Sequence, residues 1–422
     1  MVKKIGIIGL GNVGQATVRS LHKFAKLITH RTSLKLEVKE ACDFRKARGK
    51  ALLKYQVPFT TQASKIINDP AIDIVVELVG GLEPSRTYIL EALKKGKHVV
   101  TANKALLATS GRQIFSLANR MNRRVGFEAS VCGAIPLIKS ISEGLISCEV
   151  EKIYGILNGT TNYILSKMSR EKIDFQVALK EAQKKGIAER NPTLDIDGID
   201  TLHKLCILSY LCFGIWPEFS RVHTEGISQI SLFDVLYAEE LHYSIKLLAI
   251  AKKEGKKLEL RIHPTLVSIE HPLSKVSNAF NAAFLDTQPA GELLFYGLGA
   301  GGVPTSSSVI SDIVSIALNE KGFIRKEERM RLKNINEIKT RYYIRFMTQD
   351  RPGVLAKIAK ILASFDISIA SVTQKEPQSR RTVPIVMITH RAREANMQKA
   401  LNRINQLPVI KSPTRLIRIE DI

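Results

Sequence analysis

Cysteine, aromatic side chains and long apolar runs are all scarce in this sequence of 422 residues. Its five cysteines include no Cys-x-x-Cys pair, which argues against a disulfide framework and indicates free thiols in a reducing compartment. The longest nearly apolar run, residues 205–216, is too short to cross a bilayer. Glycines interrupt the apolar residues after Met1–Lys4 and no small-residue cleavage site follows, so this start indicates a strand rather than a signal peptide. We therefore expect a cytoplasmic protein without a membrane segment.

Acidic side chains are also few relative to basic ones. The chain has 63 Lys and Arg against 40 Asp and Glu, a net charge of +23. Such an excess is typical of nucleic-acid-binding proteins, but their basic residues are concentrated and interleaved with stacking aromatics. Here the basic residues are spread along the chain and only 6% of residues are aromatic. We therefore expect no nucleic-acid partner and assign most of this charge to solvated surface.

The length exceeds what one hydrophobic core usually serves, so two or three domains are expected. In the first 130 residues, strand-like runs alternate with helical patterns, which predicts an α/β domain with a doubly wound parallel sheet. The clearest strands are Lys4–Ile8, Asp73–Val79 and His98–Thr101. We expect this domain to span residues 1–130 and to be completed by 302–320. Residues 131–301 would then form a second domain, with an apolar helix near 199–213.

The C-terminal part of the chain has a different pattern. Residues 321–340 are strongly charged and are predicted to be a linker with some helix, and 341–422 are predicted to be a small α+β unit. In that unit, the turn Asp350–Gly353 separates an alternating strand from a helix. Further strands are predicted at Ile367–Val372 and Val383–Thr389. The apolar residues of the first strand are Tyr342, Ile344 and Phe346. Those of the helix, which are predicted to share its core-facing side, are Val354, Leu355, Ile358, Ile361 and Leu362.

A glycine-rich turn directly follows the first predicted strand. Gly9-Leu-Gly11-Asn12-Val13-Gly14 lies between that strand and a helical pattern, which is the context that a dinucleotide-binding turn requires. Gly9 would allow the tight turn, Gly11 the approach of a pyrophosphate, and Gly14 the close packing of helix on strand. The N–H groups at the helix start, from Asn12 and Val13 onward, would bind the phosphates. We therefore predict a dinucleotide site.

The choice between NAD and NADP stays open on these residues. Asp43 could end the second strand and bind a ribose hydroxyl, as NAD use requires. Arg45, Lys46 and Arg48 follow it and could instead hold the 2′-phosphate of NADP. Asp43 also lies further from the glycines than the usual spacing of about 20 residues. We favour NADP, with NAD tolerated.

Two polar segments are candidates for chemistry. In residues 99–104 a strand ends and Lys104 follows at its C-terminal edge, which faces the ligand crevice in open parallel sheets. The alternative is an ordinary surface lysine in a loop. In the second segment, Asp200 and Lys204 are four residues apart and so share one face of the apolar helix. The alternatives here are that Asp195 and Asp197 cap that helix, and that Asp200 and Lys204 form a surface salt bridge.

At these residues the chain resembles the homoserine dehydrogenase family, over residues 3–318. Residues 341–422 resemble an ACT domain, a regulatory module that binds amino acids, with Asp350, Pro352 and Gly353 in its characteristic turn. The resemblance implies a Rossmann-type doubly wound sheet, then an α+β catalytic and dimerisation domain, then a ferredoxin-like α+β ACT domain. The matching segments include IDIVVELVGG (72–81), KHVVTANKALL (97–107), FEASVCGAIP (127–136), GILNGTTNYIL (155–165), DIDGIDTLHKL (195–205) and YGLGAGGVPT (296–305).

The resemblance implies an enzyme that interconverts aspartate semialdehyde and homoserine with NAD(P)H, in threonine, methionine and isoleucine biosynthesis. Lys204 matches the family's proton donor, Lys104 its second lysine between nicotinamide and substrate, and Asp200 a polar partner. Two neighbouring lysines would depress each other's pKa and bring a donor nearer to neutral pH. The remaining matches are Glu189 for the substrate amino group, and Asp195, Gly159 and Thr160 for other substrate contacts. We also predict that Arg45 and Gly301 lie at the cofactor.

The resemblance also implies ligands beyond the substrate and the nicotinamide. A loop matches the family's site for a structural monovalent cation such as sodium, held mostly by carbonyl oxygens. For the ACT domain the implied effector is an amino acid, with threonine the natural candidate, gripped near Asp350 and Gly353. Paired catalytic domains and paired ACT units imply a homodimer or a homotetramer. The matched cation ligands are Glu128, Val131, Gly133 and Ile135.

The chain departs from the family pattern close to the site. Gly186-Ile187 stands where glycine and an aromatic residue are usual, Arg190–Pro192 replaces Ala-Asp-Pro, and Leu298 replaces a proline. These changes leave a non-enzymatic alternative, an amino-acid-sensing regulator with a decayed dehydrogenase body. Because both lysines, Glu189 and Asp200 are retained, we expect an active enzyme.

Overall fold

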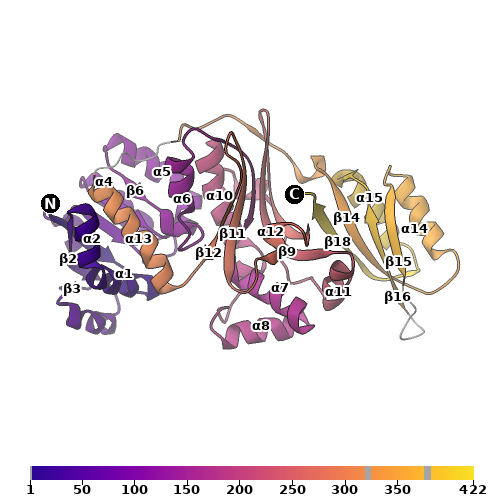
Figure 1. Ribbon diagram of the computed structural model, residues 1–422, viewed down its shortest axis with the longest axis horizontal. Helices are drawn as coiled ribbons and strands as arrows, with labels where there is room; N and C mark the ends of the chain where they lie inside the picture. The colour runs from indigo at the N-terminus through magenta and orange to yellow at the C-terminus, as the bar shows by residue number, and fades with distance from the viewer. Residues whose placement is uncertain (1, 319–324, 375–381) are drawn as a thin grey trace.

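The β-branched runs of the first 130 residues form a parallel sheet at one end of the molecule (Figure 1). The structure is a computed structural model that describes residues 2–318, 325–374 and 382–422. The strand order is β3-β2-β1-β4-β5-β6 and every neighbouring pair is parallel, as in a doubly wound Rossmann sheet, so this part of the predicted fold is confirmed. The strands are β1 (Val2–Ile8), β2 (Lys35–Cys42), β3 (Phe59–Thr60), β4 (Ile74–Glu77), β5 (His98–Thr101) and β6 (Val125–Gly126).

Helices bury both faces of this sheet, which explains why its strands are apolar at successive positions. Ile74 and Val76 pack in one cluster with α1 (Asn12–Lys23) and α13 (Gly302–Ala317). Val75 points the other way, into a cluster with residues of three helices. Those helices are α3 (Ala63–Asn68), α4 (Ser85–Lys94) and α5 (Lys104–Arg120); α2 (Ala25–Thr32) extends from α1. Helix α13 therefore follows the strands of the second domain in sequence and returns to cover the first sheet (Figure 1).

A second, antiparallel sheet follows in the middle of the molecule, with the order β12-β11-β7-β9-β10. Its helices include α10 (Ile199–Phe213), which lies between this sheet and α5 and has all but two of its 15 residues buried. The strands are β7 (Glu149–Ile156), β9 (Tyr243–Glu254), β10 (Lys257–Ser268), β11 (Phe280–Gln288) and β12 (Gly291–Leu298). The other helices are α6 (Leu137–Lys139), α7 (Gly159–Glu171), α8 (Phe175–Lys184), α9 (Thr193–Ile196), α11 (Leu232–Glu240) and α12 (Pro272–Lys275).

Apart from the two-residue strand β17, the C-terminal unit has the element order βαββαβ, and its main sheet has the order β18-β14-β16-β15. This is the predicted ferredoxin-like arrangement. Leu355 was predicted to face the core of this unit, but its side chain is 39% exposed, whereas Val354, Ile358 and Leu362 are buried. The elements are β14 (Lys339–Thr348), α14 (Val354–Ala363), β15 (Ile369–Gln374), β16 (Val383–Thr389), β17 (Ala392–Arg393), α15 (Glu394–Asn405) and β18 (Ile410–Glu420).

The two sheets of the middle and C-terminal domains are continuous. Strand β18 pairs in parallel with β10, from Thr265 opposite Arg418 to Val267 opposite Glu420. Upstream on the same edge, β10 also pairs with β8 (His223–Thr224) and with β13 (Arg331–Leu332). Residues 321–324 of the predicted linker lie outside the described residues, and its later part holds β13 and a short 3₁₀ turn. Across the described ranges, no helix has the length and apolar character needed to span a membrane.

Candidate active site

The glycine-rich turn lies at the C-terminal end of β1, where a parallel sheet opens towards its ligand crevice. Gly9 has a φ of +102°, and a side chain there would place its Cβ 2.5 Å from the backbone of Leu78. A Cβ on Gly14 would lie 2.0 Å from the carbonyl oxygen of Gly9. A Cβ on Gly11, in contrast, would meet no atom within 4 Å, so the backbone is open on that side. The turn therefore has two structural glycines and one glycine that leaves room for a ligand.

Two helix starts meet beside this turn. Helix α1 begins at Asn12 and α13 at Gly302, and a Cβ on Gly302 would lie 2.7 Å from the carbonyl oxygen of Asn12. Gly301, the N-cap of α13, has a φ of +112°, and neither helix has a side-chain hydrogen bond at its N-cap. The first N–H groups of a helix have no intrahelical acceptor and lie at the positive end of its dipole. This pair of uncapped starts fits a dinucleotide pyrophosphate.

Asp43 and its basic neighbours lie at the end of β2, beside the same turn. One carboxylate oxygen of Asp43 accepts hydrogen bonds from Leu10 N and Arg48 Nη1, both at 2.8 Å, and the other accepts from Arg45 N at 2.9 Å. The residue is 4% exposed and its carboxylate braces the glycine-rich turn from within the protein. The side chains of Arg45 and Lys46 are exposed beside it. Asp43 therefore has a structural role that its position in the sequence did not reveal.

At the junction of the first two domains, two lysines share one carboxylate. Asp200, in the first turn of α10, lies 2.7 Å from Lys204 Nζ through Oδ2 and 3.0 Å from Lys104 Nζ through Oδ1. Lys104 is the first residue of α5 and so follows β5, as the sequence predicted. Asp200 is 6% and Lys204 7% exposed, because α10 is enclosed on all sides. The alternative of a surface salt bridge between Asp200 and Lys204 is therefore wrong.

Asn158 completes this cluster. It is the N-cap of α7, where its Oδ1 accepts from Thr161 N at 2.8 Å, while its Nδ2 donates to Asp195 Oδ1 at 2.7 Å and to Asp200 Oδ2 at 2.8 Å. The sequence interpretation missed this residue, although a capping residue next to Gly159 was a usable signal. The alternative that Asp195 and Asp197 cap α10 is also wrong, because the N-cap of α10 is Gly198 and no side chain bonds there.

The charges of this cluster shift each other's pKa. Burial alone would raise the pKa of Asp200, but the two ammonium groups, Lys204 foremost, hold it well below its usual range. Attraction by Asp200 raises the pKa of Lys104. The prediction that the two lysines would lower each other's pKa is therefore wrong for Lys104, because the shared carboxylate outweighs the repulsion. Burial raises the pKa of Asp195.

The other predicted substrate residues surround this cluster. Gly159 begins α7, and a Cβ there would lie 2.8 Å from the carbonyl oxygen of Ala279. Thr160 is buried and donates from Oγ1 to Ile187 O at 3.1 Å. Glu189 is exposed at the outer side of this cluster, and its negative charge contributes to the raised pKa of Lys104. The residues predicted for substrate binding therefore all lie around Lys104, Asp200 and Lys204.

The unusual residues of the 187–192 loop are accommodated locally. Asn191 Oδ1 accepts from Thr193 Oγ1 at 2.6 Å, and so braces the turn that leads into α9, the short helix that carries Asp195. Arg190 is exposed, and its carbonyl oxygen accepts from Gln183 Nε2 at 3.3 Å. Leu298 O accepts from Ala134 N at 3.1 Å while its side chain remains 44% exposed. None of these departures displaces a residue of the lysine cluster.

The predicted cation loop forms several hydrogen bonds within the protein. The carboxylate of Glu128 accepts from Ile138 N at 2.9 Å and from Lys139 N at 2.8 Å, so it is bound to the N–H groups of α6. Gly133 O accepts from Ser308 Oγ at 2.7 Å. The described residues contain no group of three or more His, Cys, Asp or Glu side chains placed to hold a metal.

The predicted effector turn lies at the far end of the molecule, at the start of α14. Asp350 and Gly353 are both exposed. Gly353 is the N-cap of α14 with a φ of +85°, and a side chain there would meet no atom within 4 Å. The turn is therefore open to solvent on the side where a ligand would approach.

Comparison with known proteins finds three family matches along the chain. Residues 9–128 match a model described as homoserine dehydrogenase, NAD binding domain, residues 136–314 match homoserine dehydrogenase, and residues 342–409 match the ACT domain. The homoserine dehydrogenase of Helicobacter pylori is 41% identical over 99% of both chains. That of Neisseria gonorrhoeae is 38% identical over 99% of this chain and 98% of its own.

Solved structures agree with these matches. The crystal structure of a homoserine dehydrogenase from Thiobacillus denitrificans superposes with a TM-score of 0.94 at 41% identity, over 100% of this chain and 99% of that one. A hyperthermophilic archaeal homoserine dehydrogenase in complex with NADPH has a TM-score of 0.67 at 26% identity, over 77% of this chain and all of its own. The similarity therefore extends over all three domains.

Proposed function

The chain belongs to the homoserine dehydrogenase family and is an oxidoreductase with a C-terminal ACT domain, and from this premise we propose that it reversibly reduces L-aspartate 4-semialdehyde to L-homoserine. The observation that carries the proposal is the pair of lysines on the buried Asp200, beside the glycine-rich turn of a nicotinamide-binding domain. In this role the enzyme would serve threonine, methionine and isoleucine biosynthesis.

We propose that Lys204 is the proton donor of the reduction. The nicotinamide cofactor, when bound, supplies the hydride to the aldehyde carbon. Negative charge then develops on the carbonyl oxygen, and an ammonium group at hydrogen-bonding distance stabilises it and passes a proton to it. Asp200 fixes the positions of both ammonium groups, because each of its oxygens holds one of them. In the reverse direction Lys204 takes the hydroxyl proton of homoserine as the hydride leaves.

Substrate recognition is assigned to the residues around this pair. Glu189 lies exposed at the rim, where a carboxylate can pair with the substrate's amino group. Asp195 and Thr160 lie on the inner side, and Gly159 at the start of α7 packs against the backbone of Ala279. In this arrangement the amino group of the substrate would lie at Glu189 and its aldehyde group at Lys104 and Lys204.

We propose NADP as the preferred cofactor, with NAD accepted. Asp43 already holds three protein donors, while Arg45 and Lys46 are exposed at the end of β2. A guanidinium and an ammonium in that position favour a 2′-phosphate over a bare ribose hydroxyl. The NADPH in the archaeal relative is consistent with this preference.

The test is absorbance at 340 nm with purified protein, L-homoserine and each of NADP and NAD. Lys204→Ala is the inactive variant, and Lys275→Ala, an exposed lysine of α12, is the matched control. Reduction of the cofactor by the wild type and the control but not by Lys204→Ala supports the proposal. A folded wild type that binds cofactor without reducing it would contradict the proposal and favour the amino-acid-sensing alternative.

A monovalent cation such as sodium is proposed for the loop of Glu128, Val131, Gly133 and Ile135. The carboxylate of Glu128 is bound to the N–H groups of α6, so the carbonyl oxygens would provide most of the coordination. The cation would hold the loop between the two domains without entering the reaction. This stabilisation is measured by comparing the melting temperature in sodium with that in a bulky organic cation at equal ionic strength. Equal melting temperatures would contradict the cation site.

Regulation by an amino acid, with threonine as the first candidate, is proposed for the ACT domain. The open turn at Asp350 and Gly353 supports it. Calorimetric titration of threonine with and without homoserine tests it, because linkage requires each ligand to change the other's affinity by the same factor. Titrations that are identical with and without homoserine would contradict it.

Assembly and compartment are also proposals. We expect a cytoplasmic homodimer or homotetramer. The exposed apolar side chains Leu294, Tyr296 and Leu298 on the edge strand β12 support association, and five free cysteines support a reducing compartment. Light scattering measures the mass in solution, and a monomer at micromolar concentration would contradict the first proposal.

A further inference from the structure

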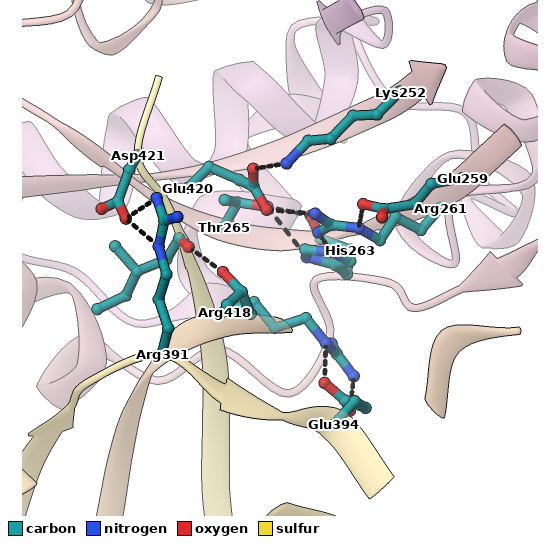
Figure 2. Close-up of polar contacts among 12 residues, drawn as sticks. Lys252, Glu259, Arg261, His263, Thr265, Arg391, Glu394, Arg418, Glu420 and Asp421 are labelled. Carbon is teal, nitrogen blue, oxygen red and sulfur yellow. Dashed lines mark hydrogen bonds and ion pairs between the residues drawn. The ribbon is translucent and has the colours of Figure 1, made fainter. Parts of the chain in front are cut away.

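The junction between the catalytic sheet and the C-terminal domain is built around two buried arginines (Figure 2). Arg261 of β10 is 1% exposed and pairs with Glu259 of its own domain and with Glu420 of β18. Arg418 of β18 is 3% exposed. An arginine stays charged when buried and so needs paired, hydrogen-bonded partners, which are held in a fixed geometry around both side chains.

Arg418 joins the C-terminal domain to one residue of the catalytic domain. Its Nε and Nη2 donate to the two carboxylate oxygens of Glu394 at 3.0 and 2.6 Å, a forked pair that is visible in Figure 2. Its remaining nitrogen, Nη1, donates to Glu225 Oε2 at 3.0 Å. Glu394 is itself held by Tyr342 Oη at 2.9 Å. One planar guanidinium thus ties Glu225 to the core of the ACT domain.

Glu225 lies in a segment that supports the approach to α10. Its N–H donates to Ile262 O of β10 at 2.8 Å, and two residues later Ile227 N donates to Ile196 O at 2.8 Å. Between them, Gly226 lies so close to the end of α9 that a Cβ there would lie 2.2 Å from Ile196 O. The segment is therefore packed backbone against backbone beneath the end of α9.

This segment supports the turn at residues 196–198, which lies between two carboxylates of the active site. Asp195 precedes the turn, Asp200 follows it, and Asn158 donates a hydrogen bond to each. Between them, Gly198 packs so closely that a Cβ would lie 3.2 Å from Thr224 and 3.3 Å from Ile262. A displacement of residues 224–227 would therefore move Asp195 and Asp200 relative to Lys104.

We propose that Arg418 is a positioning residue for the reaction. It holds Glu225, and through the 224–227 segment it sets the placement of Asp195 and Asp200, so the ACT domain contributes to the geometry of the active site from a distance. The proposal rests on the proposed homoserine dehydrogenase activity. It assigns to Arg418 a role in substrate binding, separate from any role in holding the two domains together.

Arg345 provides a matched control. It also belongs to the ACT domain and also forms a forked pair with the catalytic domain, at 2.7 and 3.1 Å from the oxygens of the buried Asp234, although Arg345 itself is only partly buried. Asp234 lies in α11, whose contacts reach α7 through Glu239 and Ser169, near the C-terminal end of α7 rather than its start. Arg345 also donates to Ser231 Oγ at 3.3 Å, but none of its hydrogen bonds among the described residues reaches 224–227. Losing this pair therefore weakens the domain junction and leaves the direct contacts of that segment in place.

The experiment compares steady-state kinetics of homoserine oxidation in full-length Arg418→Met and Arg345→Met. Arg418→Met is expected to raise the KM for homoserine about ten-fold, short of the ~100-fold that a displacement of 1 Å can cause, with the KM for NADP unchanged. Arg345→Met is expected to lower the melting temperature and to leave both KM values unchanged. Equal changes in KM for the two variants would overturn the proposal.

Glu225 supplies the second variant in case Arg418→Met fails to fold. Its side chain is 32% exposed, and Glu225→Ala leaves the Arg418–Glu394 pair intact. The KM for homoserine should rise in Glu225→Ala as in Arg418→Met, and the double variant should be no worse than either alone. Glu225→Gln, which keeps an oxygen acceptor for Arg418, should recover most of the loss. An unchanged KM in Glu225→Ala overturns the proposal, whereas an inactive wild type would instead overturn the proposed function.

Discussion

Lys246 is a buried lysine whose removal should stabilise the enzyme at neutral pH. It lies in β9, is 4% exposed, and donates from Nζ to Val276 O at 2.5 Å. No carboxylate among the described residues forms an ion pair with it, and burial lowers its pKa to about 8. The ammonium form is thus penalised by lost hydration with only one carbonyl in exchange. The perturbation is Lys246→Met, which keeps the length of the side chain and removes the charge.

The magnitude follows from the difference between the folded and unfolded pKa. The unfolded lysine has a pKa of 10.5, so a folded value of about 8 costs roughly 3 kcal/mol at pH 7, where both states are protonated. Because the folded pKa is the lower one, this penalty is complete below pH 8 and fades as the pH rises towards 10.5. At pH 9.5 about 1 kcal/mol remains. Lys246→Met also loses one hydrogen bond worth about 1 kcal/mol, so its net gain is about 2 kcal/mol at pH 7 and near zero at pH 9.5.

Urea unfolding followed by tryptophan fluorescence measures this difference. Trp216 is the single tryptophan of the chain and stacks on Tyr210 with ring centroids 4.4 Å apart, within the core that also includes β9. The free energy of unfolding is compared for wild type and variant at pH 7.0 and pH 9.5. Lys275→Met, at an exposed position on α12, corrects for the loss of one positive charge. A difference in the free energy of unfolding between the two proteins that does not change with pH would refute the reasoning. A variant less stable than the wild type at pH 7 would show that Lys246 has a buried counter-charge.

Three further predictions concern the site. Asp200→Asn should lower kcat/KM by about 100-fold or more, because it leaves two ammonium groups side by side without their shared carboxylate, and cofactor binding measured by fluorescence should persist. Gly14→Ala should lower the melting temperature without cofactor, whereas Gly11→Ala should leave that temperature unchanged and weaken NADP binding, because only the first Cβ meets protein atoms. Arg45→Ala should raise the KM for NADP but not for NAD, and equal effects on both would argue against a 2′-phosphate contact.

The features that were predicted correctly from the sequence depend on short stretches of chain. The glycine-rich turn lies between a strand and a helix, and strand β5 and helix α10 have the predicted bounds, because turn chemistry and apolar periodicity act over a few residues. The parallel pairing of the first sheet followed from the alternation of strands and helices. The four-residue spacing of Asp200 and Lys204 placed them on one face of α10, as observed.

What was missed depends on contacts between distant segments. The pairing of β10 with β18 joins residues about 150 positions apart in the chain and follows no local pattern. Burial of α10 on all sides converts an Asp–Lys pair that resembles a surface salt bridge into an enclosed cluster. Leu355 lies within an apolar pattern but faces outward. The raised pKa of Lys104 depends on a carboxylate 96 positions away, which repetition or spacing along the chain cannot indicate.

The continuity of the two sheets bears on how regulation could work in this enzyme. An ACT domain attached only by a flexible linker would communicate with the active site through changes in assembly. Here β18 is hydrogen-bonded to β10, and the same strand carries Arg418, which reaches Glu225. A ligand that moves β18 relative to α15 would strain a buried, forked ion pair, and such pairs tolerate little distortion before they break. A shift in the ACT domain would therefore displace Asp195, which is assigned to the substrate, and Asp200, which holds the two lysines.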